Sequence, residues 1–285
     1  NRGLMGNNIV LRNTVVDMYA KCGVVEKAQQ VLEELPVRDV IAWSSLIAGY
    51  VQQGQCHNAL ECFERMQREG LSPNRVTLVC VLRACGESGA VDKGKQIHEH
   101  ILKGGLLYKD IMLGTALVGM YTKCGSLAKA QEVLEGLSVR DMISWSVLIS
   151  GYAQQGQNYE ALNCLERMRS EGLTPDKVTF QCILSSCSHS GLLEKAQLWF
   201  RNMTEEYDMI PDLKHHACMV VVLGSAGLFD EAISMVKVMP NCLEVWLALL
   251  GACRKWGNVK HGRLAFNRTM QGNKTCTAAY ALLED

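Results

Sequence analysis

The chain has 285 residues, 48% of them hydrophobic, and its 29 basic residues balance 29 acidic ones. No run of 18 uninterrupted apolar residues occurs, so we expect no helix that spans a membrane. Zero net charge argues against a nucleic-acid ligand, because neutralising phosphates normally supplies much of such affinity. The chain starts at Asn1 rather than Met, and we expect a piece of a longer protein without its targeting segment.

Eight glycines mark an internal repeat. The steps between them run 31, 35, 36, 31, 35, 36 and 30 residues, and a small residue, Ala or Gly, follows each glycine five positions later. A period of roughly 20–50 residues is typical of repeat proteins, in which each unit packs on its neighbours. The glycines are Gly23, Gly54, Gly89, Gly125, Gly156, Gly191, Gly227 and Gly257.

Residues 40–74 illustrate one repeat. Apolar residues at helical spacing predict a helix near residues 42–52, which Gly54 ends. A second amphipathic pattern runs from Ala59 to Met66, and Pro73 cannot continue it. The repeat is therefore predicted to be a helical hairpin. A single hairpin cannot cover its apolar face, so the hairpins must stack into a superhelix with a concave surface.

Each repeat begins fourteen residues before its glycine in this interpretation. An initial fragment, 1–8, is the end of a preceding repeat. The repeats that follow are 9–39, 40–74, 75–110, 111–141, 142–176, 177–212 and 213–242, with a further segment from residue 243.

Three positions within the repeat carry most of the information. The fourth position is aromatic in four repeats and predicts packing between repeats rather than a bound aromatic ligand: Trp43, Trp145, Phe180 and Trp246. The last position is Asp or Asn in six consecutive repeats: Asp39, Asn74, Asp110, Asp141, Asp176 and Asp212. Asp or Asn directly before a helix caps its unpaired amides, so helix capping by itself explains these six residues.

Capping does not explain the fifth position. It is small and polar in the 31- and 35-residue repeats only (Asn13, Ser44, Thr115 and Ser146), whereas the 36-residue repeats have Val79 and Gln181. The second position is apolar in all six repeats: Val10, Ile41, Val76, Met112, Ile143 and Val178. An apolar side chain beside two short hydrogen-bonding ones, once per repeat on one face, predicts a row of sites that each hold one base.

The thirteen cysteines contain no C-x-x-C pair, and several recur with the repeat, as Cys22 does at Cys124. We interpret them as small core residues in a reducing compartment and predict no metal site. The tract His98–Glu99–His100 superficially suggests metal ligands, but neighbouring residues on a helix point in different directions.

These residues resemble the PLS class of plant organellar pentatricopeptide repeat proteins. In that family short (S), ordinary (P) and long (L) repeats cycle in triplets, and the repeats here run S, P, L, S, P, L, with a closing S-type repeat at 213–242 and the end of an L repeat at 1–8. Residues 243–276 resemble the extension called the E1 motif, and 277–285 resembles the truncated start of the next extension. The resemblance implies an all-α fold, a right-handed superhelical solenoid of helix-turn-helix repeats.

The resemblance also implies that the fifth and last residues of each S or P repeat read one nucleotide of single-stranded RNA. Asn13 with Asp39 implies U, Ser44 with Asn74 implies A, and Thr115 with Asp141 and Ser146 with Asp176 each imply G. The second-position residues would sandwich the bases, and the expected preference is 5′-U-A-n-G-G-n-3′. The closing repeat, with Ala217 and Cys242, is assigned no base.

Lys21 and Lys123 match the phosphate-contacting lysine of the family. Since only two repeats carry this lysine, we expect modest affinity and a shallow salt dependence.

Proteins of this class select sites for C-to-U RNA editing in chloroplasts or mitochondria, so the resemblance implies a DYW-type deaminase and multiple-organellar-RNA-editing-factor proteins as partners. A deaminase of this kind needs H-x-E and P-C-x-x-C, and neither pattern occurs. We therefore expect a reader without catalytic residues, metal or cofactor, whose deaminase lies outside this chain or acts in trans. Two alternatives stay open: RNA binding for transcript stabilisation, processing or splicing, and a protein-binding helical scaffold.

Overall fold

The computed structural model describes residues 9–105, 110–237 and 242–272, and every regular element within them is an α-helix. The chain divides into two compact parts, Asn1–Leu148 and Ile149–Asp285, with the division inside α9. The predicted repeat end at 1–8 and the extension start at 277–285 lie outside the described residues. The helices are α1 (Ile9–Lys21), α2 (Val25–Glu33), α3 (Val40–Gln52), α4 (Cys56–Arg68), α5 (Arg75–Ser88), α6 (Val91–Lys103), α7 (Ile111–Lys123), α8 (Leu127–Gly136), α9 (Met142–Gln154), α10 (Asn158–Ser170), α11 (Lys177–Ser190), α12 (Leu193–Glu205), α13 (Leu213–Ser225), α14 (Phe229–Lys237), α15 (Leu243–Lys255) and α16 (Val259–Gly272).

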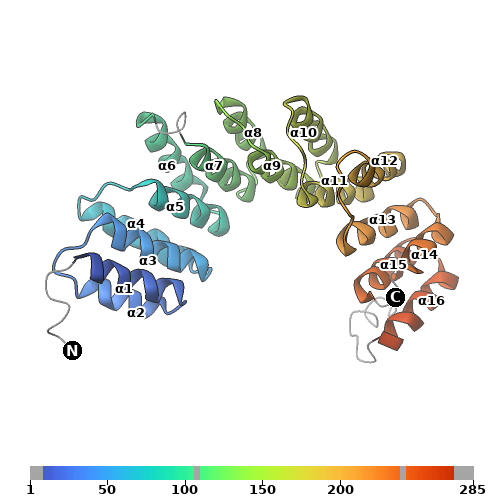
Figure 1. Ribbon diagram of the computed structural model, residues 1–285, viewed down its shortest axis with the longest axis horizontal. Coiled ribbons are helices and arrows are strands. Elements are labelled where there is room, and N and C mark those ends of the chain that lie inside the picture. Colours follow the sequence, from blue (N-terminus) through green and yellow to red (C-terminus); the bar gives the residue numbers. More distant parts are fainter. Residues whose placement is uncertain (1–8, 106–109, 238–241, 273–285) are drawn as a thin grey trace. The chain divides into compact units, whose positions relative to one another are not determined.

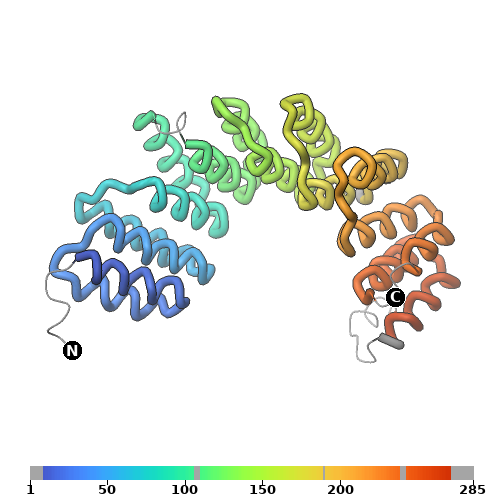
Figure 2. Tube along the Cα trace, viewed as in Figure 1, coloured from blue at the N-terminus to red at the C-terminus, as the bar shows by residue number. Residues whose placement is uncertain are grey.

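The helices of each part pack as successive hairpins (Figure 1). In the N-terminal part the odd-numbered helices from α1 to α7 contact one another in series. Each of α2, α4 and α6 packs against the odd-numbered helix that precedes it and the one that follows it. In the C-terminal part α11, α13 and α15 form the same kind of series, with α12 and α14 packed beside them. The path of the chain shows the alternation of the two helix layers within each part (Figure 2). The prediction of an all-α stack of helical hairpins is confirmed.

The turn inside each hairpin depends on the glycine that marks the repeat. All eight glycines have φ between +66° and +77°, in the left-handed region that side chains disfavour. At Gly54 the amide donates to the Val51 carbonyl at 3.1 Å, and the Gln55 amide reaches back to Tyr50 at 2.9 Å. These bonds satisfy carbonyls that the end of α3 would otherwise leave unpaired.

Close packing of each hairpin requires the small residue that follows the glycine. The six alanines at this position are fully buried: Ala28, Ala59, Ala130, Ala161, Ala196 and Ala232. At Gly94, which takes the same position, an added Cβ would lie 2.5 Å from the Met120 sulfur. At Gly94 a larger residue would therefore require the Met120 side chain, which belongs to the next hairpin, to move.

The fourth-position aromatic residues lie in the core, as predicted. Trp43, Trp145 and Phe180 have no exposed surface, and Trp246 is 4% exposed. Trp43 Nε1 donates a hydrogen bond to Glu69 at 3.0 Å, and Glu69 also pairs with Arg38 of the preceding repeat. This network joins the first repeat to the second.

One helix boundary differs from the sequence prediction. The helix predicted near residues 42–52 begins at Val40, because Asp39 accepts hydrogen bonds from the amides of Ile41 and Ala42 and so caps the helix two residues earlier. Hydrophobic periodicity locates the middle of a helix better than its first turn.

The described cysteines form no disulfide bond with one another, and half of them are buried. Burial raises the pKa of the Cys85 thiol to about 12 and that of Cys187 to about 11, so both stay neutral at physiological pH. Within the described residues no group of three or more metal-ligating side chains occurs. None of the described helices has the length and hydropathy that a membrane span requires.

The substitution Gly54→Ala is expected to lower the free energy of unfolding by about 1 kcal/mol. An added Cβ would meet no atom within 4 Å, so the cost comes from the left-handed backbone alone. Gly136→Ala is the matched control, because Gly136 also has open space around it but ends α8 without a positive φ. This control should stabilise the chain, since Ala favours helix. Denaturation of both variants measures the difference, and a loss of equal size in both would contradict the role of the turn.

Candidate nucleic-acid interface

The last residue of each of the first six repeats caps the helix that follows. Side-chain oxygens of Asp39, Asn74, Asp110, Asp141, Asp176 and Asp212 accept hydrogen bonds from amides in the first turn of α3, α5, α7, α9, α11 and α13. Capping of these helices is therefore confirmed. It places the side chain of each capping residue at the start of a first helix, close in sequence to the second position of the next repeat.

The second position is exposed in every repeat where it is apolar. The exposed fractions of Val10, Ile41, Val76, Met112, Ile143 and Val178 lie between 51% and 68%, although these residues belong to helices whose other apolar residues are mostly buried. An exposed branched or long apolar side chain at one register position, six times over, is a surface that a ligand can cover.

The first predicted base-reading pair is in direct contact. Asn13 Nδ2 donates a hydrogen bond to Asp39 Oδ2 at 2.8 Å, while Asp39 Oδ1 accepts the amides of Ile41 and Ala42 at 3.1 and 2.9 Å. One carboxylate oxygen thus caps α3 and the other orients Asn13. The buried Oδ1 of Asn13 has no hydrogen-bond partner among the described residues.

The second pair is arranged differently. Asn74 Oδ1 accepts from the Thr77 amide at 2.9 Å, from the Thr77 hydroxyl at 3.0 Å, and lies 3.5 Å from Ser44 Oγ. The Ser44 hydroxyl also lies 2.6 Å from the Val40 carbonyl oxygen and from the Thr77 hydroxyl. Because its oxygen is used by the protein, the Asn74 amide presents its NH2 group as a donor.

The third pair lines a cavity of about 320 Å³ in the N-terminal part. Thr115 and Asp141 share its walls with Met112 and Ile143, the second-position residues of the two successive repeats. Position nine of this repeat is Gly119, which also lines the cavity and has only Val147 within 4 Å of an added Cβ. Asp141 Oδ1 caps α9 through the Ser144 amide at 2.8 Å.

The fourth pair falls on the two sides of the division of the chain. Ser146 belongs to the N-terminal part, where its hydroxyl donates to the Met142 carbonyl at 2.7 Å. Asp176 belongs to the C-terminal part, where its Oδ1 accepts from the amide and hydroxyl of Thr179 at 2.8 and 2.7 Å. The role of this pair stays a prediction.

The long repeats use their last carboxylate within the protein. Asp110 accepts the Met112 amide at 3.0 Å and pairs with Arg75 at 3.5 Å. Asp212 lies 2.6 Å from the buried His215 ring; burial opposes its ionisation, but the hydrogen bonds from His215 leave the pKa of Asp212 below its ordinary value. Neither carboxylate faces a small polar fifth residue, since that position holds Val79 or Gln181.

Both predicted phosphate-contacting lysines pair with carboxylates. Lys21 Nζ lies 2.7 Å from Asp17, and Lys123 Nζ lies 3.2 Å from Glu87. Lys123 also lines the 320 Å³ cavity, together with Arg83, which the sequence analysis missed. The signal was present, because Arg83 follows Val79 by four residues and so lies on the same face of α5.

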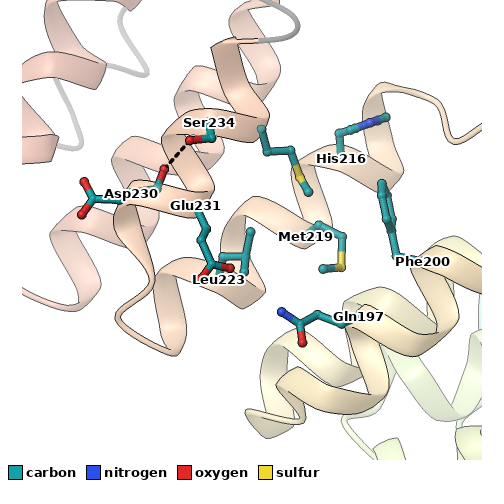
Figure 3. A pocket seen from close by; sticks show the side chains of 9 residues that line it. Gln197, Phe200, His216, Met219, Leu223, Asp230, Glu231 and Ser234 are labelled. Carbon is teal, nitrogen blue, oxygen red and sulfur yellow. Dashed lines mark hydrogen bonds between the residues drawn. The ribbon is translucent and has the colours of Figure 1, made fainter.

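A larger cavity, of about 590 Å³, lies between α12, α13 and α14 in the C-terminal part (Figure 3). It forms where His216 and Leu223 occupy the positions at which the second repeat has the buried Trp43 and Tyr50. Its charged lining residues are Asp230 and Glu231, which would repel phosphate. This cavity faces the second helices rather than the second and fifth positions of a first helix, so we assign it no part in the interface.

The tract His98–Glu99–His100 serves packing. The His98 ring is buried, its Nδ1 lies 3.0 Å from the Tyr121 hydroxyl, and the two rings meet edge to face at 5.6 Å. Burial lowers the pKa of His98, which keeps the ring neutral.

Known protein families match this chain at several of the repeats described above. The PPR repeat family matches residues 38–87 and 140–189, and a second pattern for the PPR repeat matches residues 10–40 and 178–207. A crystal structure of the pentatricopeptide repeat protein PPR10 with an 18-nucleotide psaJ RNA element superimposes with a TM-score of 0.77, at 18% identity over 98% of this chain and 45% of that chain. The helical stack described above is therefore the fold of PPR10.

Three relatives from Arabidopsis thaliana are more similar in sequence. CRR2, a chloroplastic pentatricopeptide repeat-containing protein, is 40% identical over 98% of this chain and 43% of its own length. A second chloroplastic protein of the same description is 38% identical over 98% of this chain and 38% of its own length. A mitochondrial one is 38% identical over 98% of this chain and 44% of its own length. The chain thus spans less than half the length of these relatives, and it belongs to the pentatricopeptide repeat family.

Proposed function

We propose that this chain binds single-stranded RNA and that each S or P repeat holds one base. The observation that carries the proposal is the cavity at repeat 111–141, where exposed Met112 and Ile143 stand beside Thr115 and Asp141. RNA is recognised mainly in single strands, through contact with the base faces and hydrogen bonds to the base edges, and these residues offer both. The RNA bound by PPR10, which shares the fold, supports the assignment of the ligand class.

The hydrogen-bonding groups at the first two pairs support the order U and then A. The Oδ1 of Asn13 is buried and has no partner among the described residues; once RNA binding exposes it, this acceptor would suit the N3–H donor of uracil. Asn74 has its oxygen bound to Thr77 and offers NH2 to an acceptor such as N1 of adenine. At the third pair, the carboxylate of Asp141 suits the N–H donors on the edge of guanine. The proposed preference is 5′-U-A-n-G-G-n-3′, with no base read by the long repeats.

We further propose that the chain is of the PLS class, with the E1-like motif at 243–276, and that it selects sites for C-to-U editing in an organelle. The chloroplastic and mitochondrial relatives support an organellar location. The reaction would then be carried out by a DYW-type deaminase outside this chain or in trans, assisted by multiple-organellar-RNA-editing-factor proteins.

In plants that lack the protein, we expect particular cytidines next to U-A-n-G-G-n sequences to stay unconverted in organellar transcripts. Sequencing of these transcripts measures the conversion. Normal editing together with shortened or unspliced transcripts would replace the editing assignment by a role in transcript processing.

Direct binding tests the base-reading proposal. The chain should bind an oligonucleotide with U-A-n-G-G-n more tightly than a scrambled control of equal composition, because each matched edge satisfies a group that a wrong base leaves unpaired. One wrong base typically costs about 1–3 kcal/mol, so two or more should weaken binding by about 30-fold or more in a titration. Equal affinity for the two oligonucleotides would refute base reading, and no binding to either would favour a protein partner.

The substitution Asn74→Asp should move the preference at the second base from A towards G. It replaces the NH2 donor by a carboxylate acceptor, whereas Asp and Asn cap a helix almost equally well, so folding should be retained. Asp110→Asn is the matched control, because it makes the reverse exchange at the end of a long repeat. Affinities for four oligonucleotides that differ only at the second base measure the shift. An unchanged profile in the Asn74→Asp variant, or an altered one in the control, would contradict the assignment.

A further inference from the structure

A carboxylate lies among the cations beside the cavity at repeat 111–141. Glu87, in the last turn of α5, accepts a hydrogen bond from Arg83 Nε at 2.9 Å and from Lys123 Nζ at 3.2 Å. The Cys56 thiol donates to its second oxygen at 3.4 Å. Glu87 is thus held by three donors from three successive repeats. It occupies the thirteenth position of its repeat, where the S repeats 9–39 and 111–141 carry Lys21 and Lys123.

The close approach of α5 and α7 brings Lys123 to this carboxylate. At Gly86 an added Cβ would lie 3.2 Å from Met120 Cα and 3.3 Å from the Cβ and Cδ of Lys123. The missing side chain therefore lets the stem of Lys123 lie against α5, with its ammonium group directed at Glu87. Since Arg83 and Lys123 both line the cavity, two cations border the proposed base site.

The cluster has the composition of an occupied phosphate site. Two cations and one anion leave one net positive charge, and the Glu87 oxygens receive the hydrogen bonds that a phosphate oxygen would receive. The hydrogen bond from Arg83, with further ones from Lys123 and Cys56, lowers the pKa of Glu87, so the group is ionised at neutral pH. Arg83 and Lys123 are both more than half exposed, and exposed ion pairs contribute little to stability, so a competing anion can displace the carboxylate.

We propose that Arg83 and Lys123 form a binding site for one RNA phosphodiester, and that Glu87 is a built-in counter-anion which the RNA backbone must displace. The proposal rests on the proposed function, and it adds to it Arg83 as a backbone contact and Glu87 as a residue that weakens RNA binding. The long repeat 75–110 then contributes to RNA affinity without reading a base.

The next set of three repeats does not contain this arrangement. The residues that correspond to Arg83, Glu87 and Lys123 in the next set of three repeats are Ser185, His189 and Ser225. The effect of Glu87 should therefore be confined to one phosphate, next to the fourth nucleotide of U-A-n-G-G-n, which the repeat 111–141 would bind.

The test is the substitution Glu87→Gln in the whole chain, which keeps a hydrogen-bond acceptor for Arg83 and removes the charge. We expect RNA binding to tighten about 1.4- to fivefold, the fold-change that corresponds to the free energies measured for exposed charge pairs. The slope of log K against log salt should steepen by about 0.7, the value for one more neutralised phosphate on a single strand. Both effects should appear on the scrambled oligonucleotide too, because backbone contacts do not depend on sequence.

Glu132→Gln is the matched control. It removes one negative charge from a carboxylate that pairs with Lys129 on α8, none of whose residues lines the cavity. A second control is an oligonucleotide with a neutral methylphosphonate linkage next to the fourth nucleotide, on which the gain from Glu87→Gln should vanish. The proposal is overturned if Glu87→Gln binds no more tightly than Glu132→Gln, or if its gain persists on the neutral linkage. Loss of base preference in the unsubstituted chain would instead refute the base-reading function and leave the Glu87 comparison intact on the scrambled strand.

Discussion

The hydrogen bonds with which an Asp or Asn side chain caps six of the first helices are the constraint on which the rest of this structure depends. Asp39 shows why: one of its carboxylate oxygens caps α3, so the position of the other oxygen is fixed by the fold. That second oxygen holds Asn13, which belongs to the first helix of the preceding hairpin. Helix initiation and the geometry of a candidate base site therefore depend on the same side chain. Capping and the proposed base reading are therefore compatible roles for one residue rather than competing explanations.

The same constraint accounts for the residues allowed at the end of a repeat. Asp and Asn are among the best capping residues and cap about equally well, and loss of a cap costs about 1 kcal/mol, so folding favours both at this position without choosing between them. The choice decides which hydrogen-bonding group the side chain offers. Asp offers an acceptor, whereas Asn74 offers its NH2 group as a donor. In the long repeat, Asp110 keeps the cap while Arg75 binds its other oxygen and Val79 offers no hydrogen bond. In such a repeat the last residue still caps the following helix, but its second oxygen is bound within the protein.

Much of this architecture could be predicted from the sequence because it rests on local rules. The glycine spacing located every hairpin turn, since a left-handed residue ends each first helix, and the aromatic fourth position indicated the core around Trp43. Hydrophobic periodicity alone placed the start of α3 near residue 42, whereas the capping residue Asp39 places it at Val40. The contact between Lys123 and Glu87 could not be foreseen, since it joins residues of different repeats and depends on the bare backbone of Gly86. Gly119 lines the cavity as well, although no base-reading pattern includes this residue.

The neutral net charge of the chain has a local counterpart at the two predicted phosphate-contacting lysines. Lys21 pairs with Asp17 and Lys123 with Glu87, so each predicted phosphate contact already has an anion inside the protein. Backbone contacts give affinity without sequence information, whereas contacts with base edges give both. Under the proposed function, cations that are already paired would bind the backbone of any RNA weakly. The groups at the second, fifth and last positions would then supply a larger share of the binding free energy. For the proposed selection of one site among many transcripts, weak backbone affinity would be a gain in discrimination.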